Sequence, residues 1–395
     1  MADAEASRRT ARPRLVGLDL LRLLAVTLVL GRHMWMPPAS WPAGAQAFFA
    51  LWRRGGWIGV DLFFVLSGFL VSGLLFAEFK AHGRIAPLRF YARRAWKIYP
   101  PYFVMLAATV ALILTQGGDF ERGQLLAEVF FYQNYVRGLW NHTWSLAIEE
   151  HFYLLLPLVC LLVLRTRARR PASLRAIVLL GAGVGVVELA ARIGNAMEMA
   201  PYSPYTYMFA THLRLDSLFF GVVLSYAYHF HTARFVELLT PWRVPLLLGG
   251  SLLLAPAFLI TLESPLMYTV GYTVLYIGSG MLVVGALLSD PRRRRTLGAL
   301  ATLGAFSYSI YLWHMPVLVW GLPLLEQLFG MSFPFSVRLV SYVGGSMAMG
   351  VVMARLVEVP ALRLRDQLFP ARSTATIAVR PTPVDAAPVE RVVVV

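Results

Sequence analysis

Ten apolar stretches, each long enough to cross a lipid bilayer, constrain the fold of this chain more than any other feature. A membrane-spanning helix needs about 20 predominantly apolar residues, because the bilayer interior is about 30 Å thick. Of the 395 residues, 58% are apolar and 14% are charged, far from the balance of a soluble domain. The sequence therefore predicts an all-α, polytopic integral membrane helix bundle of about ten transmembrane helices. The predicted spans lie near residues 15–36, 57–77, 98–115, 144–164, 173–191, 209–230, 244–262, 267–288, 298–320 and 336–357.

The spans leave little of the chain for other domains. We predict a basic cytoplasmic N-terminus at residues 1–14, a membrane domain at 15–366 and a disordered cytoplasmic tail at 367–395. The first span carries several charges and lacks a small-residue cleavage site, so we expect no removable signal peptide. Cys160 is the only cysteine. We therefore expect no internal disulfide and no metal site built on thiols.

The net charge of +15 is distributed unevenly over the predicted loops. If the N-terminus is inside, the inner segments hold 26 Lys and Arg residues and the outer loops hold 5. This positive-inside bias predicts a multi-pass protein of the cell's inner (plasma) membrane with both termini in the cytoplasm. Basic runs such as residues 292–295 are then anchors for membrane lipids, and we expect no nucleic-acid partner. The pair Arg53 and Arg54, in the first outer loop, does not follow the bias.

Arg22 and His33 lie eleven residues apart within the first span. On an α-helix this spacing is three turns plus about 20°, so both side chains lie on one stripe, roughly 16 Å apart along the axis. A charged residue in the middle of a membrane helix costs about 2.5 to 3.5 kcal/mol, so it is a functional hypothesis by default. A cationic clamp and a titratable base at two depths indicate a ligand handled across part of the membrane. Asp19, one turn before Arg22, is a candidate partner for it.

Three cations, Arg93, Arg94 and Lys97, precede the third span on the predicted inner side. Arg94 and Lys97 are three residues apart and share a helix face. One interpretation is an anchor for the inner leaflet. The other is a site for the phosphate groups of a cytosolic donor, because guanidinium groups bind phosphate oxygens bidentately. The stretch alone does not decide between them.

Two adjacent carboxylates, Glu149 and Glu150, stand near the entrance of the fourth span. Ser145 and Glu149 fall on one helical face, whereas Glu150 turns about 100° away. An interfacial position is one interpretation, and we favour a polar cavity lined by these side chains. In the second span, Asp61 needs a buried partner. Ser67 and its neighbouring glycine are first of all small residues that permit close helix packing.

The later spans contain further polar side chains that we assign to the structure of the bundle or to its cavity. Arg214 and Asp216 pair either with each other or with charges on neighbouring helices. We favour a core hydrogen-bonding role for His314 over a catalytic one. Glu358 comes two residues before Pro360, which we expect to end the last span.

Seven of these segments occur in an order that resembles the acyltransferase family 3 membrane O-acyltransferases, which include O-antigen, exopolysaccharide and macrolide acylating enzymes. The resemblance covers about residues 15–366, and each motif is short on its own. The segments are Arg22 with His33, then residues 59–70, 90–100, 144–153, 214–216, 307–314 and 358–360.

This resemblance implies a ten-helix domain that takes an acyl group, usually acetyl, from cytosolic acyl-CoA and esterifies a hydroxyl. The implied acceptor is a sugar, a lipid-linked sugar or glycolipid, or a macrolide-like glycosylated molecule. Arg22 and His33 match the family's paired essential residues. Arg94 and Lys97 match its two-arginine motif, with lysine replacing the second arginine. Some members carry a fused extracellular hydrolase-like domain, for which we see no room here.

The chemistry of this reaction is consistent with the residues. Transfer from a thioester to an alcohol needs a base for the hydroxyl and stabilisation of an oxyanion. We assign His33 as the base, with direct transfer and an acyl-histidine intermediate both open. Arg22 is also expected to hold part of acyl-CoA, and Glu149 to orient His33 or Arg22. We place Arg93, Arg94, Lys97 and Ser67 at the donor site.

Acyl-CoA is then a substrate, with acetyl-CoA as the default, and no permanently bound cofactor is expected. The alternative, from another class, is a multi-pass transporter or exporter with a buried charge relay. It predicts inverted repeats with broken helices, which the sequence does not display.

Overall fold

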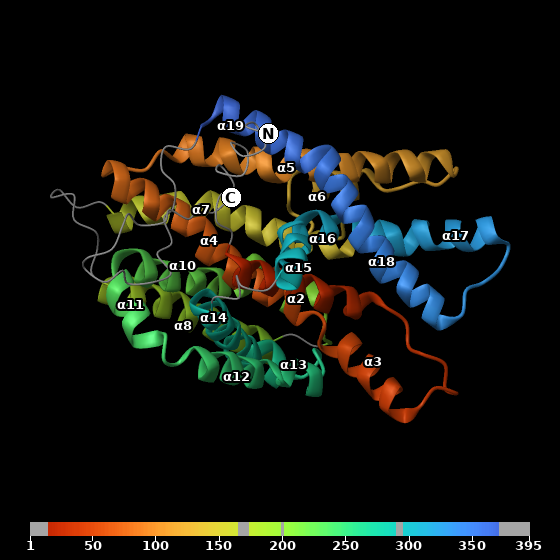
Figure 1. Cartoon of the computed structure of the whole chain (residues 1–395), viewed down its shortest axis with the longest axis horizontal. Coiled ribbons are helices and arrows are strands. Elements are labelled where there is room, and N and C mark those ends of the chain that lie inside the picture. Colours follow the sequence, from red (N-terminus) through yellow and green to blue (C-terminus); the bar gives the residue numbers. More distant parts are fainter. Residues whose placement is uncertain (1–14, 165–173, 199–200, 290–294, 371–395) are drawn as a thin grey trace.

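The computed structural model describes residues 15–164, 174–198, 201–289 and 295–370 of the chain. Over these ranges the chain forms helices, joined by turns and loops, and no strand (Figure 1). The prediction of an all-α polytopic membrane protein is confirmed. The predicted N-terminal segment 1–14, the basic run 292–294 and the tail from residue 371 onward lie outside the described residues.

Three of the helical segments are π-helical turns that continue into α-helices, and two are short 3₁₀ turns. In chain order the elements are α2 (Val16–His33), α3 (Ala43–Gly55), α4 (Ile58–His82), α5 (Pro87–Thr115), α6 (Arg122–Val129), η1 (Asn141–Thr143), α7 (Trp144–Leu164), α8 (Leu174–Glu198), α9 (Pro204–Tyr207), η2 (Thr211–Leu213), α10 (Leu215–Phe230), α11 (Thr232–Leu239), α12 (Arg243–Leu254), α13 (Pro256–Leu259), η3 (Met267–Gly271), α14 (Tyr272–Leu288), α15 (Arg295–Ala305), α16 (Ser307–Pro316), η4 (Val317–Gly321), α17 (Leu322–Phe329), α18 (Phe335–Met353), η5 (Ala354–Glu358) and α19 (Val359–Leu368).

Within the described ranges, seven helices are long and apolar enough to cross a membrane, or eight if the bent pair α11 and α12–α13 forms one span. Besides this bent pair, two predicted spans are not among the seven. The first, α2, carries Asp19, Arg22 and Arg32 within 18 residues, and α10 is only 16 residues long. Both helices nevertheless pack inside the bundle, α10 along α4 and α2 along α4 and α15. The count of about ten spans stays a prediction.

Helix α4 is the central element of the bundle, because α2, α7, α10 and α14 all pack against it (Figure 1). It approaches α10 most closely at Gly68 and Gly221. A β-carbon on Gly68 would lie 2.0 Å from the carbonyl oxygen of Leu218, and one on Gly221 would lie 2.3 Å from that of Val65. The expected small-residue packing is therefore present at Gly68, and it brings two polar helix faces into register.

The expectation that Pro360 ends the last span is wrong, because the helix continues to Leu368. The π-helical turn η5 comes immediately before α19, and Pro360 stands in the first turn of α19. A proline is tolerated there because its missing N–H is one that the preceding turn does not require. The helix therefore carries Glu358 into the bundle and extends two residues beyond the predicted domain boundary at residue 366.

Candidate active site

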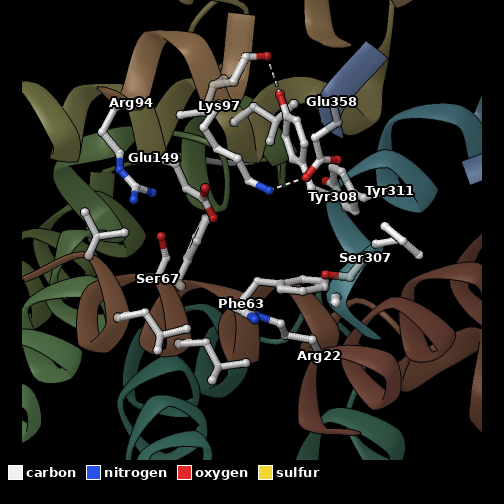
Figure 2. A pocket seen from close by; sticks show the side chains of 18 of the residues that line it. Arg22, Phe63, Ser67, Arg94, Lys97, Glu149, Ser307, Tyr308, Tyr311 and Glu358 are labelled. Atoms are coloured by element: carbon white, nitrogen blue, oxygen red, sulfur yellow. Dashed lines mark hydrogen bonds and ion pairs between the residues drawn. The ribbon is translucent and has the colours of Figure 1, made fainter. Parts of the chain in front are cut away.

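A cavity of about 360 Å³ lies between α2, α4, α5, α7, α16 and η5 (Figure 2). Its volume lies within the range of small-molecule sites. The wall combines apolar side chains such as Phe63 with a group of charged and hydroxyl-bearing ones. The polar lining residues are Asp19, Arg22, Ser67, Arg94, Lys97, Ser145, Glu149, Glu150, Tyr153, Ser307, Tyr308, Tyr311 and Glu358.

Two of the three cavity cations are held by carboxylates. Arg22 binds Asp19 one turn earlier on α2, with 2.7 Å between nitrogen and oxygen. Lys97 pairs with the carboxylate of Glu358, which also accepts a hydrogen bond from Ser309 at 2.6 Å. The pairing of Arg22 with Asp19 was one of the sequence-based alternatives. The π-helical turn η5 directs Glu358 toward α5, consistent with the frequent occurrence of such turns at functional sites.

Arg94 is different, because its guanidinium forms no ion pair or hydrogen bond with any residue that the structure describes. It lines the cavity with Lys97, as the spacing of three residues predicts. Figure 2 shows the guanidinium of Arg94 turned toward the open space near Glu149. The site thus contains one cation whose five N–H donors remain available for an anionic ligand.

Arg93, which we expected at the donor site, does not line the cavity. Its guanidinium binds Asp366 at 3.1 Å and donates a hydrogen bond to the carbonyl oxygen of Phe369. The physical reason is the helical turn of about 100° between adjacent residues, which sends Arg93 to α19 and Arg94 to the cavity. Arg93 therefore fastens the end of α19 to α5.

Both carboxylates of α7 line the cavity, so the cavity interpretation of this stretch is correct. Glu149 accepts a hydrogen bond of 2.9 Å from the hydroxyl of Tyr153. Because Tyr153 donates there, the hydroxyl of Ser67, 2.5 Å away, donates to Tyr153. Glu150 accepts a hydrogen bond of 3.1 Å from Tyr99. A tyrosine hydroxyl thus donates to each carboxylate, while the second oxygen of Glu150 is buried without a hydrogen-bond partner among the described residues. The proposed contact of Glu149 with Arg22 or His33 is absent from the hydrogen bonds of the described chain.

His33 does not line the cavity, contrary to the simplest version of the sequence hypothesis. A wall of Tyr311 and Ser145 closes the cavity on the side of the histidines. The hydroxyl of Tyr311 donates to the carbonyl oxygen of His142 at 2.6 Å, and Ser145 lies 2.6 Å from the same hydroxyl. His33 lies beyond this wall, with its ring centre 5.3 Å from that of His314. The reason is its place at the C-terminal end of α2, whereas Arg22 stands in the first half of the helix.

Asp61, Arg214 and Asp216, expected as structural or cavity charges, lie away from the cavity. Asp61 and Arg214 are each about 1% exposed, and they form an ion pair of 2.6 Å between α4 and the start of α10. The guanidinium of Arg214 also lies 4.0 Å from the ring centre of Tyr272. Of the two sequence-based alternatives, pairing with a neighbouring helix is the correct one for Arg214.

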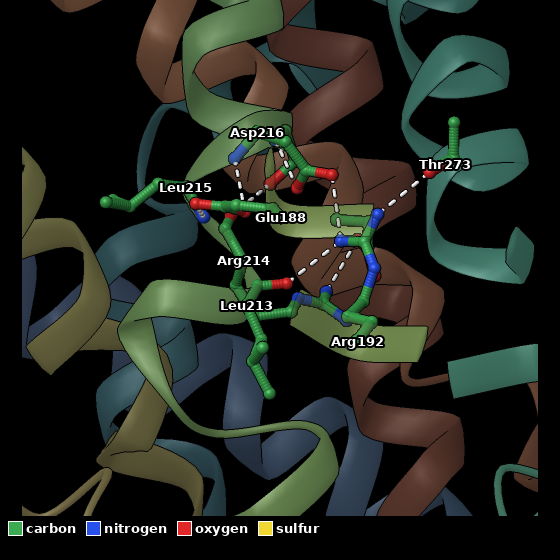
Figure 3. Close-up of polar contacts among 9 residues, drawn as sticks. Glu188, Arg192, Leu213, Arg214, Leu215, Asp216 and Thr273 are labelled. Carbon is green, nitrogen blue, oxygen red and sulfur yellow. Dashed lines mark hydrogen bonds and ion pairs between the residues drawn. The ribbon is translucent and has the colours of Figure 1, made fainter. Parts of the chain in front are cut away.

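Asp216 pairs with a residue that directly follows the predicted span 173–191 and was therefore counted among the five cations of the outer loops. Arg192 lies inside α8, fully buried, and binds Asp216 at 2.8 Å (Figure 3). Glu188, one turn earlier, accepts hydrogen bonds from the backbone N–H groups of Leu215 and Asp216. These N–H groups begin α10 and have no partner within the helix, so the carboxylate acts as its cap. The two ion pairs and this cap make the buried charge network.

Sequence reasoning missed three tyrosines of the site, Tyr153, Tyr308 and Tyr311. Tyr308 donates to the carbonyl oxygen of Ile98 at 2.8 Å and lies beneath the ammonium group of Lys97. A signal existed, because Tyr308, Tyr311 and His314 recur every three residues and so lie near one another along a helix. His314 itself donates from Nδ1 to the carbonyl oxygen of Tyr311, in agreement with a core hydrogen-bonding histidine.

The site is thus a cavity of mixed charge inside a polytopic helix bundle, with His33 beyond one of its walls. A family model described as an acyltransferase domain matches residues 15–355. The chain therefore belongs to acyltransferase family 3, and the sequence resemblance is confirmed.

The chain is similar to several curated O-acetyltransferases. It is 26% identical over 377 residues to the peptidoglycan O-acetyltransferase OatA of Listeria monocytogenes, covering 89% of this chain and 56% of the relative. It is 26% identical over 328 residues to the O-acetyltransferase OatA of Staphylococcus aureus, covering 77% and 51% respectively. The chain thus spans about half the length of the curated relatives it matches. No solved structure matches it.

Proposed function

We propose that this chain is a multi-pass membrane O-acyltransferase that moves an acetyl group from acyl-CoA to a hydroxyl of a cell-surface carbohydrate. Membership of the acyltransferase family supports the class of reaction. The names of the relatives support acetyl as the group and peptidoglycan as the kind of acceptor. The particular sugar hydroxyl is a matter for experiment.

The observation that carries the choice of acyl-CoA is the unpaired guanidinium of Arg94 in the cavity. Glu149 and Glu150 attract this guanidinium without binding it, so its N–H groups are free to form charge-assisted hydrogen bonds with an anionic ligand that enters the cavity. Arg22 and Lys97 contribute two more cations, whose pairing with Asp19 and Glu358 leaves their remaining N–H groups able to bind oxygen. Phosphate groups match these donors in charge and geometry.

The acyl end of the donor then points away from Arg94 toward the wall of Tyr311 and Ser145. His33 lies on the far side of this wall and takes the proton of the acceptor hydroxyl. The oxygen attacks the thioester carbon, a C–O bond forms, the C–S bond breaks, and the thiolate of CoA receives the proton. The wall must move for the thioester and the hydroxyl to meet, which requires the hydrogen bonds of the Tyr311 hydroxyl to break.

The direction of the reaction across the membrane follows from the charge bias. With both termini in the cytoplasm, the first half of α2 and the cavity face the cytosol, where acyl-CoA is found. The bias is stronger than the sequence suggested, because Arg192, one of the five outer cations, is buried inside α8. His33 then lies toward the outer side, and the protein acts in the plasma membrane.

The test is acetyl transfer by the purified full-length protein in lipid nanodiscs. We expect release of free CoA and transfer of radiolabelled acetyl from acetyl-CoA to a soluble peptidoglycan fragment, and loss of both in His33→Ala. The variant is to be checked for normal folding by its thermal unfolding. Absence of CoA release and of transfer in the wild type, together with solute flux in liposomes, would favour the transporter instead.

A further inference from the structure

Three imidazole rings from three different elements meet at the end of α2. His33 comes from α2, His142 from the 3₁₀ turn η1 before α7, and His314 from α16. The ring centre of His314 lies 5.3 Å from that of His33 and 4.9 Å from that of His142. The ring of His314 therefore contacts both of the others. We call these three residues the histidine cluster.

The hydrogen bond of His314 fixes the position of its proton. Its Nδ1 lies 2.5 Å from the carbonyl oxygen of Tyr311, and a carbonyl oxygen only accepts, so Nδ1 carries the hydrogen. In the neutral ring the other nitrogen, Nε2, then has a lone pair. This nitrogen is buried and has no hydrogen-bond partner among the described residues. His314 thus offers a free acceptor inside the cluster.

His142 is buried beside His314, and neither of its ring nitrogens has a well-formed hydrogen bond, although the carbonyl of Leu312 lies nearby. Its backbone is held firmly. The carbonyl oxygen accepts from Tyr311, and the hydroxyl of the next residue, Thr143, donates to the buried carboxylate of Glu128 at 2.9 Å. The ring of His142 meets that of His314 nearly edge-on, at 78°, and limits its rotation.

A buried polar atom without a partner costs about 1 to 3 kcal/mol, so natural proteins retain few of them. Nε2 of His314 is therefore available to a donor from a neighbouring ring. The ring of His33 is one of two titratable groups that contact the ring of His314, the other being His142. Ring centres 5.3 Å apart allow a hydrogen bond between His33 and His314 once their nitrogens face each other, a contact that the described residues do not yet make.

We propose that His314 is a positioning residue for His33: its Nε2 accepts the ring N–H of His33, so that the opposite nitrogen of His33 presents its lone pair to the acceptor hydroxyl. His142 supports this arrangement by holding the ring of His314 in place. The inference rests on the proposed function, with His33 as the base. In this arrangement the neutral ring of His314 orients His33, as a carboxylate orients the histidine of a catalytic triad.

The proton balance of this arrangement is complete. The hydroxyl proton passes to the free nitrogen of His33, the other nitrogen keeps its hydrogen bond to His314, and the thiolate of CoA finally takes the proton. Tyr311 links the two sites, because its carbonyl oxygen fixes the tautomer of His314 and its hydroxyl closes the cavity.

The test compares two substitutions of His314 in the full-length protein. His314→Leu keeps an apolar volume but removes the acceptor, and we expect kcat to fall about 100-fold with the KM for acetyl-CoA unchanged. His314→Gln can place its side-chain oxygen near the position of Nε2, and we expect it to restore at least a tenth of the wild-type kcat. A merely structural role would not produce this split between kcat and KM or the rescue by glutamine.

The matched control is His229, a buried histidine of α10 that packs against Phe76, away from the cluster. His229→Leu and His229→Gln should leave kcat within about threefold of the wild type. If His33→Ala is inactive while His314→Leu has the wild-type kcat, or if His314→Gln is no better than His314→Leu in a folded protein, the positioning role is overturned and the proposed function stands. If the wild type itself transfers no acetyl from acetyl-CoA, the proposed function fails first.

Discussion

The molecule places charges inside its helix bundle in two regions that differ in one respect. In the buried charge network of Asp61, Glu188, Arg192, Arg214 and Asp216, every charged side chain has a hydrogen-bonded partner, and none of the five lines the cavity. In the cavity the charges surround open space, and Arg94 has no partner within the described part of the chain. A buried charge in a membrane protein thus indicates a functional site only when it lacks a partner in the protein and lies beside a cavity.

The difference between paired and unpaired charges has consequences for stability and for ligand binding. A buried ion pair between helices contributes to the geometry of the fold, and removal of one partner leaves an uncompensated buried charge. Arg94 forms no such pair, although Glu149 and Glu150 lie near enough to attract it, so its removal should cost the fold less and ligand binding more. Substitutions in the buried charge network should therefore lower stability, whereas substitution of Arg94 should weaken donor binding.

The largest effect should follow from Arg214→Met in the buried charge network. Asp61 would lose its ion pair while remaining fully buried, so we expect the free energy of unfolding to fall by about 3 to 5 kcal/mol. Thermal unfolding in detergent measures this change. The double variant Arg214→Met with Asp61→Leu should recover part of the loss, and an unchanged unfolding temperature in the single variant would remove the distinction between the two regions.

The second effect concerns Arg94→Met, which should leave the unfolding temperature nearly unchanged. We expect the KM for acetyl-CoA to rise about 10- to 100-fold, because the donor would lose one or two charge-assisted hydrogen bonds. Steady-state kinetics of CoA release measure it. The matched control is Arg93→Met on the adjacent residue, which contacts α19 instead of the cavity and should leave this KM within about threefold. Equal effects of the two substitutions would contradict the assignment.

A smaller effect should follow from Tyr311→Phe, which removes the hydroxyl that joins Ser145 to the carbonyl oxygen of His142. We expect the wall to lose its two hydrogen bonds and kcat to change by about 10-fold, because each is worth about 1 kcal/mol. The KM for acetyl-CoA should stay within about threefold, since the cations are untouched. A change in KM alone would place the wall in donor binding instead.

The smallest effect should follow from Glu358→Gln, which breaks the ion pair with Lys97 but can still accept from Ser309. We expect the unfolding free energy to fall by about 1 kcal/mol or less. The KM for acetyl-CoA should decrease slightly, because Lys97 is then freer to bind phosphate. An increase in KM would mean that Glu358 itself holds the donor.

Much of this could be predicted from the sequence, and the remainder depends on tertiary contacts. Helix periodicity placed Arg94 and Lys97 on one face and set Arg22 and His33 at two depths. It did not show that Arg94 is unpaired while Lys97 is paired, because Glu358 reaches the site from a helix more than 250 residues away. Likewise, Arg192 was assigned to a loop from local hydropathy alone, although it is buried by its ion pair with Asp216 on the neighbouring helix α10.

Element boundaries in the second half were the weakest part of the prediction. Pro360 was expected to end a helix, and the π-helical turn before it permits the helix to continue. Such a turn has no sequence signal as clear as a capping residue. The tyrosine partners of Glu149 and Glu150 were missed for a related reason, since a carboxylate run predicts a polar site without revealing what satisfies it.

The central claim is that the cavity binds acyl-CoA through its phosphate groups, with Arg94 as the unpaired cation that receives them. Equilibrium binding of acetyl-CoA and of acetyl-pantetheine, which lacks the phosphates, to the purified wild type and to Arg94→Met tests it most directly. We predict that the wild type binds acetyl-CoA at least 10-fold more tightly than acetyl-pantetheine and that Arg94→Met loses most of this preference. Equal affinity of the wild type for the two thioesters would contradict the account.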